Sequence, residues 1–77
     1  MYSKKQDEAF LKEFGLRIRQ LRTDKGWTLE ETELHGWPSW RHLQKIEAGK
    51  NITILTLRKI ATLYKVNFSE LLDDLQD

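Results

Sequence analysis

Residues 36–50, GWPSWRHLQKIEAGK, determine the fold, because they hold the end of one short helix, a tight connection and the whole of the next helix. Ser39 stands where an N-cap residue belongs, directly after a proline and before a helix-forming run. Gly49 supplies the stop at the other end. The pattern predicts a helix over about residues 40–48.

This predicted helix has two different faces when its residues are placed at about 100° intervals. Leu43 and Ile46 define the buried side. The opposite side carries Arg41, Gln44 and Lys45. These side chains suit guanine edges, adenine edges and phosphates. A short helix that exposes such residues, and follows another short helix closely, is typical of the helix-turn-helix, whose second helix enters the major groove.

The same helix start and stop signals divide the rest of the chain into helices. Small polar residues stand at N-cap positions before each apolar run, and no period-2 alternation predicts a strand. These N-caps are Thr28, Ser39, Thr53 and Asn67, and the first and last are each followed three residues later by a glutamate that predicts a capping box. The other helices are predicted at residues 4 or 7 to 25, 29–35, 54–64 and 68–75.

Apolar residues at helical spacing predict one core for the chain. The inward positions are Phe10, Phe14, Ile18 and Leu21 on the first helix, Leu57, Ile60, Ala61 and Tyr64 on the fourth, and Leu71, Leu72 and Leu75 on the fifth. Trp27 and Trp37 are expected to join them, because burying a tryptophan stabilises a small domain. Residues 1–77 are therefore predicted to form a single all-α domain, a compact five-helix bundle.

Composition narrows the classes of function. The chain has no cysteine, which excludes disulfides and thiolate metal sites. His35 and His42 have no third ligand nearby, so no metal site is expected. There is no glycine-rich phosphate loop, and Glu30, Glu31 and Glu33 fall on a short exposed helix rather than in a cleft. We expect no enzymatic activity, no cofactor and no small-molecule ligand.

Charge and hydropathy add two expectations. The net charge is only +1, but residues 39–50 carry three basic side chains against Glu47, whereas residues 66–77 end in unpaired acidic ones. One side of the domain could therefore face an anion, although a solvated charged surface explains the same pattern. The longest apolar run, residues 52–57, is too short to span a membrane, so a cytoplasmic location is expected.

Three segments resemble the Cro and phage-repressor-like, XRE-type helix-turn-helix domain. They are FGLRIRQLRTDKGWTLEE at 14–31, SWRHLQKIEAGK at 39–50 and TLRKIATLYKVNFSELL at 56–72. The resemblance implies a lambda-repressor-like fold with the helix-turn-helix at the second and third helices. It places the core of the domain at residues 14–72 and makes residues 1–13 an N-terminal extension of the first helix.

The resemblance also implies which residues meet DNA. The third helix would be the recognition helix, with base contacts from Trp40, Arg41, Gln44 and Lys45. Contacts to the sugar-phosphate backbone would come from Thr28, Ser39, Lys50, Asn51 and Thr53, partly through helix N-terminal amides. For Trp40 two roles stay open: packing over the seam between the two helices, or an apolar contact to a thymine methyl or deoxyribose. Arg22 and Glu47 match a structural salt bridge of the family.

The second helix departs from the family pattern. The family usually has glutamine, alanine and glycine where this chain has Leu29, Glu33 and Trp37. Thr32 replaces an apolar core residue, and Glu33 is expected to point into a crowded helix contact. We favour a shorter, rotated helix that ends by Gly36 over two splayed helices, since the residue before a proline avoids helical geometry. Either arrangement weakens the phosphate contacts of this helix.

These patterns predict a sequence-specific, double-stranded DNA-binding transcriptional regulator of the repressor type. A homodimer on a palindromic operator is expected, with recognition helices about 34 Å apart. Either residues 67–77 or residues 1–10 would form the dimer contact. Two alternatives stay open: a protein-interaction module in which Trp37, Trp40 and the acidic second helix form the partner surface, and the antitoxin of a toxin–antitoxin pair.

Overall fold

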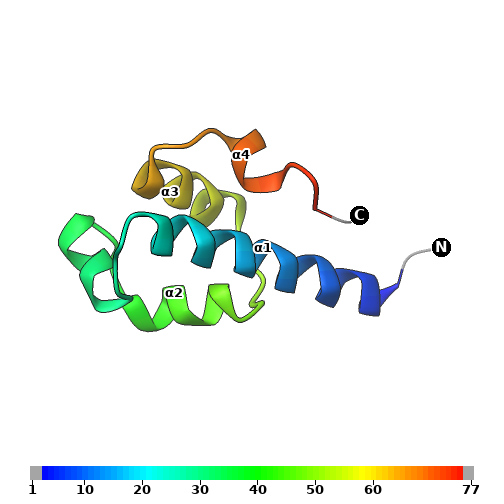
Figure 1. Cartoon of the computed structure of the whole chain (residues 1–77). Coiled ribbons are helices and arrows are strands. Elements are labelled where there is room, and N and C mark those ends of the chain that lie inside the picture. The colour runs from blue at the N-terminus through cyan, green and yellow to red at the C-terminus, as the bar shows by residue number, and fades with distance from the viewer. Residues whose placement is uncertain (1–2, 76–77) are drawn as a thin grey trace.

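The computed structural model describes residues 3–75, and every regular element in that range is helical (Figure 1). In chain order these are α1 (Lys4–Asp24), the 3₁₀ helix η1 (Glu30–His35), α2 (Trp40–Glu47), α3 (Ile54–Tyr64) and α4 (Phe68–Leu72). The predicted all-α, five-helix fold is confirmed. The prediction of one domain over residues 1–77 includes Met1, Tyr2, Gln76 and Asp77, which lie outside the described residues.

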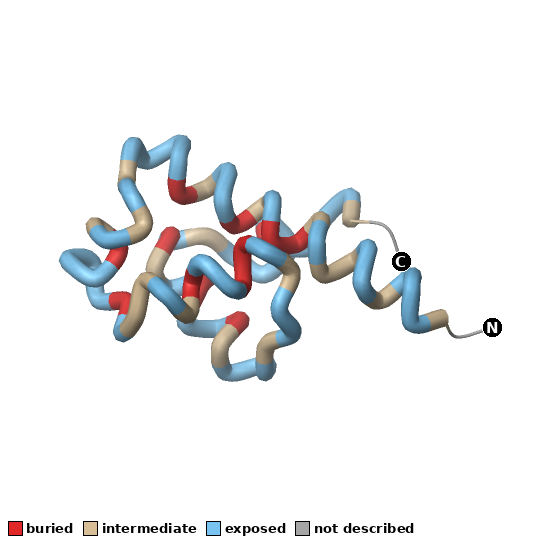
Figure 2. The backbone as a smooth tube through the Cα atoms, turned by 90° about the horizontal axis from the view of Figure 1, so that it is seen from below, coloured by how far each residue is buried: buried red, intermediate tan, exposed pale blue. Residues whose placement is uncertain are grey.

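The long helix α1 is the element around which the others are arranged. It packs against α2 on one side and α4 on another, while η1 packs against α2 and α3 against α4. Its N-terminal turns project beyond the other helices in both backbone views (Figures 1 and 2). This projection contributes to the elongated shape, with extents of 42 × 23 × 21 Å.

The core lies where the inner faces of the helices meet, and every helix contributes at least one buried position (Figure 2). It comprises Phe14, Ile18, Trp37, Leu43, Ile46, Leu57, Ile60, Ala61, Tyr64 and Leu71. The inward positions predicted for α3 are therefore all confirmed. Phe10 and Leu21 on α1 are half-buried, as is Trp27, which packs against the edge of the core.

The C-terminal helix is shorter than predicted, and Leu72 is not a core residue. α4 ends at Leu72, which is 37% exposed, whereas the sequence predicted a helix to residue 75. The guanidinium of Arg17 on α1 donates hydrogen bonds to the carbonyls of Glu70 and Asp73, at 2.8 and 2.7 Å. In a helix that continued, the carbonyl of Glu70 would accept a hydrogen bond from the amide four residues later. Here it accepts from Arg17 instead.

The predicted N-caps form. The side chain of Thr53 accepts a hydrogen bond from the Thr56 amide at 3.1 Å, and Ser39 accepts from the His42 amide at a longer 3.5 Å. Asn67 forms the predicted capping box with Glu70. Local capping chemistry thus sets the N-termini of α2, α3 and α4.

Gly15 lets α1 and α2 approach closely. It lies in the middle of α1 and is buried. A Cβ atom at this position would come within 2.4 Å of the Glu47 carbonyl oxygen and 2.7 Å of the Ile46 carbonyl oxygen. Both are backbone atoms and cannot rotate away, so the spacing of α1 and α2 requires a glycine here.

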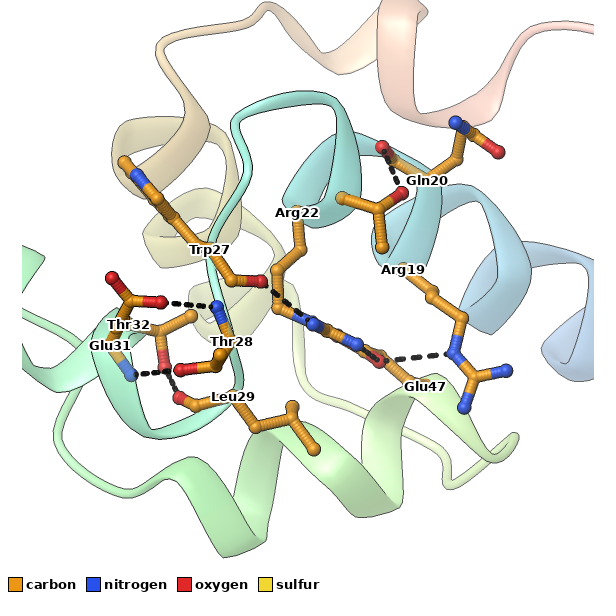
Figure 3. Close-up of polar contacts among 10 residues, drawn as sticks. Arg19, Gln20, Arg22, Trp27, Thr28, Leu29, Glu31, Thr32 and Glu47 are labelled. Atoms are coloured by element: carbon orange, nitrogen blue, oxygen red, sulfur yellow. Dashed lines mark hydrogen bonds and ion pairs between the residues drawn. The ribbon is translucent and has the colours of Figure 1, made fainter.

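A buried ion pair joins the same two helices (Figure 3). The guanidinium of Arg22 donates to both carboxylate oxygens of Glu47, at 2.8 and 2.9 Å, and to the Trp27 carbonyl at 2.9 Å. The Glu47 side chain is only 3% exposed. The hydrogen bonds that Arg22 donates to Glu47 raise the pKa of Arg22, against the opposing effect of burial. The salt bridge implied by the family resemblance is therefore present.

Gly15→Ala should destabilise the domain. We expect the free energy of unfolding to fall by about 1–3 kcal/mol, because the added methyl group overpacks the helix contact. The helix preference of alanine, up to about 1 kcal/mol, offsets only part of this. Urea unfolding followed by tryptophan fluorescence measures the change. Leu16→Ala, at a neighbouring position that is 59% exposed, is the control and should stay within about 0.5 kcal/mol. Equal stability of Gly15→Ala and the unmodified protein would contradict the close contact.

Glu47→Gln should be more damaging, with a loss of about 3–5 kcal/mol, because Arg22 is left buried without a counter-charge. Replacing both partners, as Arg22→Met with Glu47→Leu, should recover much of the loss, since no unpaired charge remains. Arg19 also lies 3.6 Å from Glu47 but is 61% exposed. Arg19→Gln should therefore cost less than about 1 kcal/mol. Chemical unfolding of the four proteins separates these contributions, and a double variant no better than Glu47→Gln would refute the argument.

Candidate nucleic-acid interface

The helix α2 presents the polar face that the sequence predicts. Leu43 and Ile46 are fully buried, and Arg41, Gln44 and Lys45 are exposed on the other side. The exposed face is basic and amide-bearing, and its three side chains come from one continuous turn and a half of helix. The structure thus brings these predicted base-contacting residues together on one surface.

Trp40 and Arg41, the first two residues of α2, contact each other. The guanidinium carbon of Arg41 lies 4.8 Å from the centroid of the Trp40 ring, over the ring. The Trp40 side chain is half-buried, so one part packs and another part reaches the surface. The guanidinium of Arg41 makes no hydrogen bond or ion pair with any other described residue, so its donors are available.

The second helix has the favoured, shortened form. It is a 3₁₀ helix that ends at Gly36, whose φ of 103° is left-handed. Trp37 follows at 4% exposure, as a core residue rather than part of an open surface. Thr32 is fully buried, and its hydroxyl donates to the Leu29 carbonyl, so its polar group is satisfied inside the core (Figure 3).

Glu33 does not point into the contact between the two helices, so that expectation was wrong. It is exposed, and its carboxylate accepts a hydrogen bond from the Trp40 amide at 2.8 Å. The reason is the winding of η1: a 3₁₀ helix has about three residues per turn, which rotates Glu33 out of the seam. An anion therefore lies at the N-terminus of α2, where the helix dipole favours negative charge.

Thr28 lies just before η1 in the predicted capping box (Figure 3). Its amide donates to the Glu31 carboxylate at 2.9 Å, and its hydroxyl oxygen accepts from the Glu31 amide at 3.2 Å. The hydrogen bond from the Thr28 backbone lowers the pKa of Glu31, which keeps the carboxylate charged. The Thr28 side chain also hydrogen-bonds the Glu31 carboxylate and lowers its pKa further, so both its backbone and its side chain serve this cap.

The remaining predicted backbone contacts lie at the two ends of α2. Ser39 is the N-cap, and Lys50, Asn51 and Thr53 follow in the exposed loop before α3. The side-chain oxygens of Asn51 and Thr53 are already used as acceptors, Asn51 from the Ile52 amide and Thr53 from the Thr56 amide of α3. The exposed ammonium of Lys50 stands beside them.

The two histidines pack on tryptophan rings. His35 stacks on Trp27 with ring centroids 3.8 Å apart and an interplanar angle of 9°. His42 lies parallel to Trp37 at 6.0 Å. Each ring therefore has a packing role that the sequence pattern did not indicate, because the tryptophans are neighbours only in the folded chain.

Comparison with known protein families agrees with this geometry. A model described as helix-turn-helix matches residues 18–71, which include η1, α2 and α3. The chain belongs to the XRE-type helix-turn-helix family. No curated protein and no solved structure matches the chain. The helix-turn-helix family is one of DNA-binding regulatory domains rather than enzymes. None of the helices in residues 3–75 combines the length and the apolar character that crossing a bilayer requires.

The carboxylate of Glu33 leads to a prediction for this helix-turn-helix. If α2 enters the major groove, Glu33 repels nearby phosphates, and Glu33→Gln should raise affinity for duplex DNA of any sequence several-fold at low salt. Stability should fall slightly, because a neutral amide interacts less well with the helix dipole. Fluorescence anisotropy with a labelled duplex at several salt concentrations measures the affinity.

Glu30→Gln is the matched control, because it removes the same charge from η1 without touching the Trp40 amide. It should raise affinity less than Glu33→Gln does. An equal rise would show that total charge, and not the position of Glu33 at the start of α2, governs the effect.

Proposed function

We propose that this protein is a sequence-specific transcriptional regulator that reads double-stranded DNA with α2 in the major groove. The observation that carries the proposal is the two-faced helix α2, whose exposed side holds Arg41, Gln44 and Lys45 while its other side is buried in the core. A helix so fixed can present side chains to base edges in a set register. Membership of a DNA-binding family supports this reading.

The proposed contacts divide into two classes. Base contacts come from Trp40, Arg41, Gln44 and Lys45, and backbone contacts from Thr28, Ser39, Lys50, Asn51 and Thr53. Arg41 is the first candidate for a bidentate pair with guanine, because its donors are free of other described partners and it stands at the start of the helix. Lys50, on the loop, contributes mainly to phosphate affinity.

We further propose that the protein acts as a homodimer on a palindromic operator. The two elements predicted for the dimer contact share one surface: an apolar groove of about 200 Å³ is lined by Phe10 and Leu11 of α1 and by Leu72 of α4. Ile54 also lines it and is 69% exposed. An isologous contact through this groove would cover apolar area from both elements at once. The repressor role and the cytoplasmic location stay predictions.

A protein-interaction surface is the second candidate function. A groove of about 700 Å³ lies beside the turn between η1 and α2, lined among others by Pro38, Leu55, Arg58 and Lys59. Leu55 is 64% exposed in it. Trp37 contributes less than the sequence suggested, because it is buried. This alternative predicts binding to a protein with little salt-sensitive binding to DNA.

Arg41→Ala and Lys50→Ala should have different effects. Arg41→Ala is expected to cost about 1–3 kcal/mol on the preferred site and to relax preference at one base pair. Lys50→Ala should weaken all sequences alike and flatten the dependence of affinity on salt. The measurements are site selection from a random duplex pool and titration of one selected site across salt concentrations.

The function itself is tested by the unmodified protein in the same titration. Failure to bind any duplex at low salt would overturn the proposal and favour the protein-interaction surface. If Arg41→Ala weakens the affinity for all duplex sequences equally and leaves the sequence preference unchanged, the protein binds DNA but Arg41 does not contact a base.

A further inference from the structure

The pair Trp40–Arg41 has a geometry that bears on which bases are read. The guanidinium of Arg41 lies over the Trp40 ring at 4.8 Å, and both residues stand in the first turn of α2. The Trp40 backbone is tied by its amide to Glu33 at 2.8 Å. Trp40 is half-buried, while Arg41 is exposed. The ring therefore acts as a platform that limits where the guanidinium can point.

We propose that Trp40 and Arg41 read a two-base unit: a guanine next to a pyrimidine that carries a 5-methyl group, as thymine does. This inference rests on the proposed function, since it requires α2 to lie in the major groove. Arg41 supplies the guanine contact. Trp40 supplies the apolar contact to the neighbouring base pair, and the cation–π contact between them makes the two contacts one unit.

The spacing of base pairs gives the physical reason. An arginine that pairs with the O6 and N7 atoms of guanine lies close to the plane of that base. A ring that the guanidinium lies over, with its centroid 4.8 Å from the guanidinium carbon, is displaced along the DNA axis toward the next base pair, which is about 3.4 Å away. Its edge then meets the major-groove edge of the adjacent pair. Among the unmodified bases, the thymine methyl is the apolar group that this edge of a pair presents.

The contact with the Trp40 ring also reduces the side-chain entropy that Arg41 loses when it binds a base. An exposed arginine ordinarily loses side-chain freedom when it binds, which costs affinity. A guanidinium already held against an aromatic face has less freedom to lose, and the cation–π contact leaves its edge donors unoccupied. Trp40 is thereby both a positioning residue for Arg41 and a contact to the adjacent methyl group.

The experiment compares two random duplex pools, one synthesised with thymidine and one with deoxyuridine in its place, which lacks only the 5-methyl group. The unmodified protein should enrich guanine followed or preceded by thymine from the first pool. From the second pool it should enrich guanine without a preference for the neighbouring base. On one selected site, replacing that single thymine by deoxyuridine should weaken binding about fourfold, as expected for one buried methyl group.

Variants assign the effect to the two side chains. With Trp40→Ala the single replacement should make no difference, and with Trp40→Phe, which keeps an aromatic ring, part of the difference should return. Arg41→Ala should lose the guanine preference. Leu16→Ala, at an exposed position of α1 that is not a proposed DNA contact, is the control and should keep the full response to the methyl group.

The outcomes are distinct. A neighbouring-base preference that persists in the deoxyuridine pool, or in Trp40→Ala, would overturn the inference and leave Trp40 as a packing residue, with DNA binding intact. Selected sites in which the guanine has no thymine neighbour would also overturn it. The absence of binding to both pools at low salt would instead refute the proposed function.

Discussion

The buried ion pair between Arg22 and Glu47 is the interaction on which the arrangement of the domain depends. Arg22 binds the last residue of α2 with two hydrogen bonds and the carbonyl of Trp27 with a third. One side chain of α1 thereby fixes the end of α2 and the connection that leads to η1. Gly15 allows the same two helices to approach until their backbones nearly touch, so the pair can form at short distance while shielded from water.

The polar face of α2 exists because the rest of the fold holds this helix. A helix of eight residues is too short to be stable alone in water. Its C-terminal end is held by Arg22, and its N-terminal end by the Ser39 cap and the Glu33 carboxylate. Between these ends, two fully buried aliphatic residues fix its rotation. The orientation of the exposed side chains is therefore set by contacts at both ends and on the buried face of the helix.

The sequence predicted the features that local chemistry controls, and it missed those that need the folded chain. Caps at Thr28, Thr53 and Asn67 follow from short-range hydrogen bonds, and the buried side of α2 follows from helical periodicity. The environment of Glu33 could not be predicted, because it depends on whether η1 winds as a 3₁₀ or an α-helix. The exposure of Leu72 depends on Arg17, which is distant in sequence, and the need for Gly15 depends on backbone atoms of another helix.

The charge distribution around α2 suggests how this domain divides affinity and specificity. The helix before it carries Glu30, Glu31 and Glu33, and the pKa of Glu31 is lowered, so the acidic character of η1 persists to lower pH. If α2 lies in the major groove as proposed, the acidic η1 gives fewer phosphate contacts than a helix with neutral or basic residues there. Fewer phosphate contacts mean weaker non-specific binding and a shallower dependence on salt. Under the proposed function, a larger share of the binding free energy then comes from base contacts, which we assign to the first turn of α2.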